Sequence, residues 1–72
     1  MNVHIAKAVA LLGGQAALAR ACGLSSTAIH KLLHGQNQPS ASTALAIERA
    51  TGGRVTRLEL LYPTESNKET AA

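Results

Sequence analysis

The segment from Gln15 to Gly35 constrains the fold more than any other part of this chain. It holds two short runs with apolar residues at helical spacing, and Gly23 separates them. Glycine adopts at little cost the left-handed backbone that ends a helix. Ser25 follows, where its hydroxyl can accept a backbone N–H and cap the next helix. The spacing therefore predicts two short helices, over residues 15–22 and 25–34, that meet at a tight turn.

Apolar side chains of these two helices are expected to form one inner face. Ala19 is small at the point where the second helix crosses closest, and Leu24 can fill the space under the turn. Ile29 follows at helical spacing and can pack back against Leu18. The residues expected to face inward are Leu18, Ala19, Leu24, Ile29 and either Leu32 or Leu33. This order is typical of a helix-turn-helix, although an ordinary helical hairpin would produce part of it.

The opposite face of the second helix carries short hydroxyls followed by longer basic groups. Ser26 and Thr27 come first, His30 and Lys31 lie one turn later, and His34 stands just beyond. Hydroxyls and cations in this arrangement suit the reading of base edges in a DNA major groove together with anchoring on phosphates. The hypothesis competes with a simpler one, in which the first-turn hydroxyls are merely solvated.

Length and composition limit the class of protein. Seventy-two residues allow one small domain, and Tyr62 is the only aromatic residue, so the core must be aliphatic. Cys22 is a single cysteine, which fits a reducing compartment, and we expect a cytoplasmic protein. The sequence has no apolar run of the roughly 20 residues that span a bilayer. We expect no secretory leader, because Met1 is followed by Asn2, Val3 and His4.

Charge is unevenly distributed along the chain. The part up to Tyr62 is basic and the tail from Pro63 is not, which favours a polyanionic partner for the folded part. The basic part carries Lys7, Arg20, Lys31, Arg49, Arg54 and Arg57 against Glu48 and Glu59. We expect Glu48 to pair with Arg49 or Arg54 at the surface.

Two further helices are predicted on either side of this motif. The first runs from about Asn2, a possible cap, to Leu12, and Gly13-Gly14 stops it. Its apolar stripe is expected to contain Val3, Ala6 (or Lys7), Ala10 and Leu11, widened by Ile5, Val9 and Leu12. Another helix begins at Ser40 or Ser42 and reaches about Thr51, with Leu45 and Ile47 facing inward.

Residues 54–61 admit two interpretations. Thr56 and Glu59 have the spacing of a capping box, which favours a short fifth helix, whereas Arg54 to Arg57 could begin a brief strand. We favour the helix. The predicted fold is an all-α compact bundle of four to five short helices, with a helix-turn-helix domain over residues 1–63 and a disordered polar tail over 64–72.

The sequence resembles the Cro-like and YdaS-like prophage regulators, small helix-turn-helix proteins of the lambda-repressor-like class. The resemblance covers about residues 3–63. It rests on LGGQAALAR at 12–20, GLS at 23–25, AIERATGG at 46–53 and TRLEL at 56–60, with Ile29, Leu32, Gly35, Pro39, Val55 and Pro63.

The resemblance implies a protein that binds operator DNA as a dimer on an inverted repeat. It also implies that Gln15 touches a phosphate, and helix N-termini favour anions in general. Loop amides can donate to phosphates as well. The candidate DNA-contacting residues are Gln15, Ser25, Ser26, Thr27, His30, Lys31, Gln36 and Asn37.

A second surface is expected to join two copies of the chain. The apolar residues after Gly53 exceed what one face of a five-residue helix can bury, although burial in the chain's own core is the alternative. The candidate dimer residues are Val55, Leu58, Leu60, Leu61 and Tyr62. Arg54 and Arg57 could flank the DNA or lie at this contact.

We therefore expect a sequence-specific transcriptional regulator of double-stranded DNA, a Cro-type repressor of a phage or prophage promoter. The alternative is a toxin–antitoxin component or another protein-interaction module acting on a host protein. His30 and His34 have a spacing that can bind a metal, and Cys22 and His4 are the residues available to complete such a site, but no further ligand spacing supports one. No nucleophile and base come with a third group, so we expect no enzyme and no cofactor.

Overall fold

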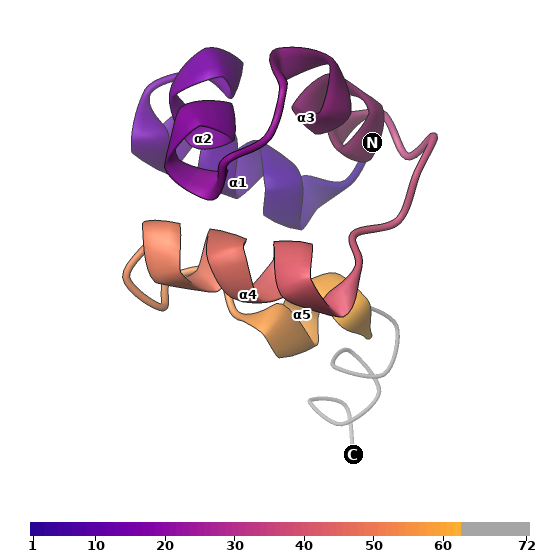
Figure 1. Cartoon of the computed structure of the whole chain (residues 1–72). Coiled ribbons are helices and arrows are strands. Elements are labelled where there is room, and N and C mark those ends of the chain that lie inside the picture. The colour runs from indigo at the N-terminus through magenta and orange to yellow at the C-terminus, as the bar shows by residue number, and fades with distance from the viewer. Residues whose placement is uncertain (63–72) are drawn as a thin grey trace.

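The computed structural model describes residues 1–62, and these form five α-helices and no strand. The helices are α1 (Val3–Leu12), α2 (Gln15–Cys22), α3 (Ser26–Leu33), α4 (Ala41–Ala50) and α5 (Arg57–Leu61). Figure 1 shows α2 and α3 together on one side of the molecule and α4 and α5 on the other. Helix α1 contacts α2, α3 and α5. The predicted all-α bundle is confirmed for these residues, and the predicted polar tail lies outside them.

Polar side chains begin four of the helices, as the sequence predicts. Asn2 Oδ1 accepts the backbone N–H groups of His4 and Ile5 at 3.0 and 3.1 Å. Ser25 Oγ accepts from Ala28 N at 3.1 Å, and Ser40 Oγ from Thr43 N at 3.2 Å. Thr56 Oγ1 accepts from Glu59 N at 3.2 Å. Each bond satisfies one of the N–H groups that a helix start leaves without an intrahelical partner.

Glycine sets the two sharp changes of direction around α2. Gly13 has φ +94° at the end of α1, and α1 and α2 are bent by 91° relative to each other. Gly23 has φ +71° at the end of α2. Because side chains other than glycine are strained at these φ values, the turns depend on glycine at both positions.

The core is aliphatic and formed by residues from every helix. Its fully buried large side chains are Ile5, Leu18, Ile29, Ile47 and Val55. Burying a side chain of this size contributes about 1.5–3 kcal/mol, so these few residues supply much of the stability of so small a domain.

Two predicted inner faces are right only in part. Ile5, Ala6, Val9, Leu12 and Ile47 lie in or against the core as expected, whereas Val3, Ala10, Leu11 and Leu45 do not. In α1 the buried residues are Ile5 and Ala8, whereas Val3 is 68% exposed and Leu11 is 39% exposed. In α4 the buried residues are Ala44 and Ile47, and Leu45 is partly exposed outside the core cluster. Both helices are apolar on more than one face, so the spacing alone does not say which face packs.

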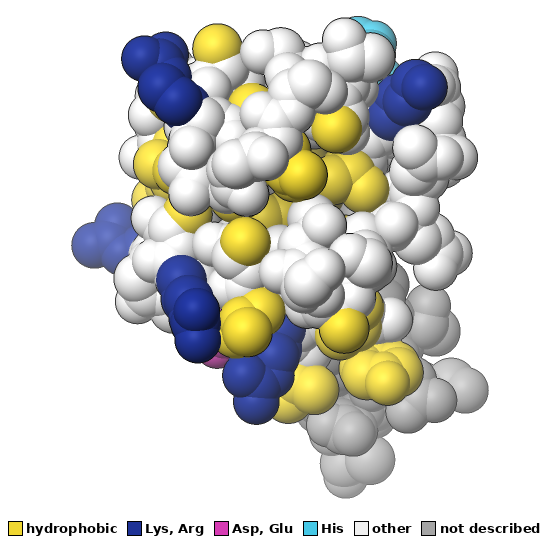
Figure 2. Space-filling view, viewed as in Figure 1, with side chains coloured by type: hydrophobic (Ala, Val, Ile, Leu, Met, Phe, Trp, Pro, Cys, Tyr) yellow, Lys and Arg dark blue, Asp and Glu magenta, His cyan; other side chains and the backbone are white. Residues whose placement is uncertain are grey.

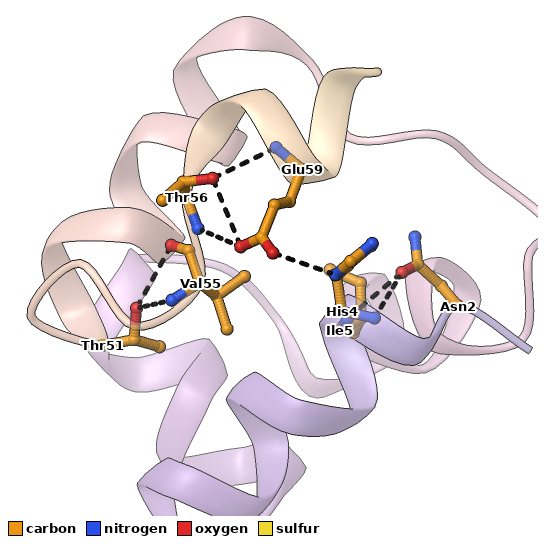
Figure 3. Close-up of polar contacts among 7 residues, drawn as sticks. All are labelled: Asn2, His4, Ile5, Thr51, Val55, Thr56 and Glu59. Carbon is orange, nitrogen blue, oxygen red and sulfur yellow. Dashed lines mark hydrogen bonds and ion pairs between the residues drawn. The ribbon is translucent and has the colours of Figure 1, made fainter. Parts of the chain in front are cut away.

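A buried hydroxyl connects α4 to α5. Thr51 is 8% exposed, and its Oγ1 donates to the Ile47 carbonyl at 3.0 Å. The same oxygen accepts the Val55 N–H at 3.1 Å (Figure 3). The bond holds Val55 in the core, and α5 then begins after Thr56. Glu59 returns a hydrogen bond by accepting the Thr56 N–H at 3.0 Å, which completes the predicted capping box. The alternative of a strand at residues 54–57 is therefore wrong.

Candidate nucleic-acid interface

The turn between α2 and α3 is built from backbone hydrogen bonds and one glycine. The Leu24 N–H donates to the Ala19 carbonyl at 2.8 Å, and the Gly23 N–H donates to the Arg20 carbonyl at 3.3 Å. Ala19 is 3% exposed, and Ile29 is fully buried in the core cluster that holds both helices. Leu24 packs against this cluster. The turn therefore has the geometry predicted from the sequence, and it fixes the direction in which α3 leaves α2.

The contact face of α3, which we define as Ser26, Thr27, His30 and Lys31, is exposed to solvent. Helix α3 has one exposed and one buried face, because its other face places Ile29, Leu32 and Leu33 in the core. Both Leu32 and Leu33 are buried, so the choice left open between them is settled in favour of both. The outward direction of the four side chains is confirmed.

Ser25 lies at the start of this face with its oxygen already engaged. Its Oγ accepts the Ala28 N–H at 3.1 Å, and the side chain is exposed. A hydroxyl that accepts one hydrogen bond still has its own proton to donate, so capping and a phosphate contact are compatible.

The loop after α3 brings two predicted contact residues beside the contact face. The Gln36 N–H donates to the Lys31 carbonyl at 2.9 Å, and the Asn37 N–H lies 3.4 Å from the same oxygen. Both side chains are exposed, whereas Pro39 is buried. Gln36 and Asn37 therefore flank the C-terminal end of α3.

Gln15 lies elsewhere, as the first residue of α2, and is half-buried. The residue before it, Gly14, has no side chain with which to cap this helix start. A helix start without a side-chain cap leaves backbone N–H groups for an anion. Helix α2, which begins at Gln15, packs against α3, which carries the contact face.

Electrostatics favour an anionic partner on the side of α2 and α3. The first 47 residues contain no Asp or Glu, and they carry Lys7, Arg20 and Lys31. Figure 2 shows Lys and Arg side chains at several separated places on the visible face and only a trace of Asp or Glu. The cations do not form one continuous stripe in this view, so charge alone does not define a groove for DNA.

The two glutamates of the described residues lie on α4 and α5. Glu48 Oε1 is 3.8 Å from Arg57 Nη1, so the predicted pairing with Arg49 or Arg54 is wrong. Glu59 Oε2 is 3.9 Å from His4 Nδ1. Each acidic group therefore has a basic side chain within 4 Å, although Glu48 Oε1 is buried without a hydrogen-bond partner.

The candidate dimer surface is smaller than predicted. Val55 is fully buried and Leu60 is 3% exposed, so both belong to the core of one chain and neither can meet a partner. Leu58 in α5 and Tyr62 at its end point outward, 60% and 55% exposed. Leu61 is half-buried against the core. We call the exposed pair Leu58 and Tyr62, with Leu61 at its edge, the α5 surface.

The His and Cys side chains of residues 1–62 support no metal site. No group of three His, Cys, Asp or Glu side chains there could hold a metal ion. The His30 and His34 rings are close, with centroids 4.2 Å apart. His34 was not among the predicted contact residues. Its position four residues after His30, which places both on one helix face, could have indicated it. Cys22 is half-buried, and this burial raises the pKa of its thiol.

No single helix in the described part of the chain is long and apolar enough to cross a membrane. The lengths and compositions of α1 and α2 suffice only when the two are taken together, and the pair is bent by 91°.

Five short helices with a tight α2–α3 turn and an exposed polar face on α3 define a helix-turn-helix protein. The chain matches the family described as "Bacterial toxin YdaS" over residues 5–66, and it belongs to that family. It is 41% identical over 59 residues to the Escherichia coli (strain K12) protein named "Putative transcriptional regulator YdaS". The match covers 82% of this chain and 60% of that relative, so the chain spans less than two thirds of the relative's length. No solved structure matches the chain.

Proposed function

We propose that this protein is a sequence-specific regulator of transcription that binds double-stranded DNA with α3 in the major groove. The observation that carries the proposal is the division of α3, which buries Ile29, Leu32 and Leu33 and exposes the contact face. A recognition helix needs such a division, because one face must be fixed to the domain while the other reaches base edges.

The chemistry of the contact face supports the same proposal. Ser26 and Thr27 occupy the first turn of α3, where helix-turn-helix proteins place base contacts. Lys31 carries a cation of the kind that binds guanine or phosphate. The relative's name describes a transcriptional regulator, and we carry that role to this chain. Repression of a phage or prophage promoter, in the manner of Cro, is the form we propose.

Assembly on DNA completes the proposal. One recognition helix reads only a few base pairs, and two copies related by a twofold axis place their helices about 34 Å apart in successive major grooves. We propose that the α5 surface joins the two copies, in solution or on DNA. Arg57, next to Leu58 in α5, pairs with Glu48 and so belongs to the α4–α5 side of the domain.

Selection of bound sites from random duplex DNA tests the proposal. We expect enrichment of an inverted repeat, and binding of the selected duplex should survive an excess of unrelated competitor DNA. Enrichment of no sequence, or loss of all binding in competitor, would contradict sequence-specific recognition. A single asymmetric half-site bound by a monomer would leave α3 as the reader and refute the dimer.

The family description favours a second candidate function, that of a toxin. We propose a host protein as the target of such a toxin. Expression of matched variants separates the two functions. If the protein arrests growth by binding DNA, Lys31→Ala should relieve the arrest, since Lys31 is on the contact face. If it arrests growth through a protein partner, Lys31→Ala should remain toxic.

A further inference from the structure

Two histidines lie against each other at the C-terminal end of α3. The centroids of the His30 and His34 rings are 4.2 Å apart, and their planes are inclined by 52°. The backbone places both residues on the same helix face, because the His34 N–H donates to the His30 carbonyl at 3.0 Å. Both side chains are exposed. His34 therefore extends the basic end of the contact face by one residue beyond Lys31.

Within residues 1–62, α3 and the two helices packed most extensively against it, α1 and α2, carry no carboxylate that could stabilise positive charge on this pair. Helix α3 itself contributes Lys31, and the helices packed against it contribute Arg20 from α2 and His4 and Lys7 from α1. The chain start also lies beside α3, because the Asn2 N–H donates to the Leu33 carbonyl at 2.8 Å (Figure 1). The acidic groups of the described residues, Glu48 and Glu59, are on α4 and α5 with basic partners of their own.

Two protonated imidazoles at this separation repel each other unless an anion lies beside them. In the free protein the C-terminal carbonyl groups of α3 offer only a partial negative charge. A DNA phosphate supplies a full one. The environment of the pair therefore changes sharply between the free protein and a complex in which α3 lies on the duplex.

We infer that His30 and His34 together form a proton-linked phosphate contact, which takes up a proton from solvent when α3 binds DNA. The proton bonds to an imidazole nitrogen, and the resulting N–H donates to a phosphate oxygen. Histidine is the side chain that changes charge between pH 5 and 8, so affinity for duplex DNA rises as the pH falls through that range. The inference rests on the proposed function and adds His34 to the interface.

The expected size of the effect follows from linkage. Uptake of one proton on binding increases affinity by up to about tenfold for each pH unit in the titrating range. Over pH 8 to 6 we expect the affinity of the wild-type protein to rise by about tenfold or more. One additional phosphate contact should also steepen the dependence of log affinity on log salt concentration by about 0.9 at the lower pH.

Fluorescence anisotropy with the selected duplex, at constant ionic strength from pH 6 to 8, tests the inference. The variants are His30→Gln, His34→Gln and the double variant, since glutamine keeps a polar side chain that does not titrate. His4→Gln is the matched control, because it removes an α1 histidine whose Nδ1 lies 3.9 Å from Glu59 Oε2 and which is not part of the pair. Thermal melts at each pH establish that every variant is folded.

We expect a steep pH dependence in the wild type and in His4→Gln, and a flat one in the double variant. Specific binding that does not vary with pH, a double variant that keeps the slope, or a His4→Gln variant that loses it overturns the inference alone. Absence of duplex binding at every pH overturns the proposed function as well, so the two failures are distinguishable.

Discussion

The Nδ1 atom of His4 lies 3.9 Å from the Oε2 atom of Glu59, which joins the first turn of α1 to the first turn of α5. The other carboxylate oxygen of Glu59 accepts the Thr56 N–H at 3.0 Å (Figure 3). One carboxylate therefore caps its own helix and contacts a second helix. This contact links α5, the last described helix, to α1, the first.

The charge of Glu59 should make stability depend on pH. The Thr56 N–H is the main cause that holds the pKa of Glu59 below its ordinary value of 4.5, and the charges of His4 and Lys7 add to it. Because the folded pKa is the lower one, this contribution is complete above about pH 4.5 and is lost as the pH falls through the folded value. Urea denaturation at pH 6, 4.5 and 3 should show the loss.

Glu59→Gln is the matched control for this prediction. Glutamine keeps an oxygen that can accept the Thr56 N–H, as capping boxes allow, but it does not titrate. The variant should lose less stability than the wild type between pH 4.5 and 3. An identical loss in both proteins would assign the acid sensitivity to other groups.

Thr51→Val should destabilise the fold although the side-chain shape is nearly conserved. The valine leaves the buried Val55 N–H without the Oγ1 acceptor that it has at 3.1 Å. An orphaned buried donor costs about 1–3 kcal/mol. Thr51→Ser keeps the hydroxyl and should lose less, and equal unfolding free energies for the two variants would show that the hydroxyl is unimportant.

Gly23→Val should destabilise the turn between α2 and α3. A Cβ at Gly23 would meet no heavy atom within 4 Å, so the cost comes from the backbone at φ +71° and not from a clash. A left-handed conformation costs about 1–2 kcal/mol for an ordinary residue, and less for Asn. Thermal melts should therefore rank glycine first, Gly23→Asn second and Gly23→Val last. A Gly23→Val protein as stable as the wild type would be inconsistent with this turn.

Alanine substitutions on the contact face should weaken specific binding without unfolding the protein. Ser26, Thr27 and Lys31 are all exposed, and loss of a good base contact costs about 1–3 kcal/mol. Affinity for the selected duplex is the measurement. Arg49→Ala, which removes an exposed cation from α4, is the control for general charge loss. Wild-type affinity in all three contact-face variants would mean that α3 does not read DNA.

Aspartate substitutions in α5 should separate self-association from folding. Leu58 is 60% exposed, so Leu58→Asp should reduce dimerisation and cooperative DNA binding while leaving the melting transition intact. Leu60 is 3% exposed, so Leu60→Asp should bury an unpaired carboxylate and abolish cooperative melting. Sedimentation combined with thermal melts distinguishes the two, and a Leu58→Asp protein that dimerises normally would exclude the α5 surface.

The helix boundaries could be predicted because their signals are local. Asn2, Ser25 and Thr56 each cap a helix within three residues of the N–H that they accept, and Gly23 needs only its own φ to end α2. Such signals are complete in a short window of sequence. The contact face was predictable for a related reason, since α3 is apolar on one face alone.

The errors concern packing between distant segments. Val3 and Ile5 are both apolar residues of α1, and only the positions of α2, α3 and α5 decide that Ile5 is buried. Leu45 and Ala44 pose the same ambiguity in α4. Val55 and Leu60 lie in the core because Thr51 and the capping box orient α5. No local sequence pattern indicates which side of α5 then faces the other helices.

The exposure of Tyr62 has a consequence for spectroscopy. Tyr62 is the only aromatic residue among the 72, with no Trp and no Phe, and this residue is 55% exposed on the α5 surface. The near-ultraviolet absorbance and emission of this protein therefore arise from one ring outside the core. Such a signal changes little when the aliphatic interior melts, but it responds to whatever comes into contact with α5.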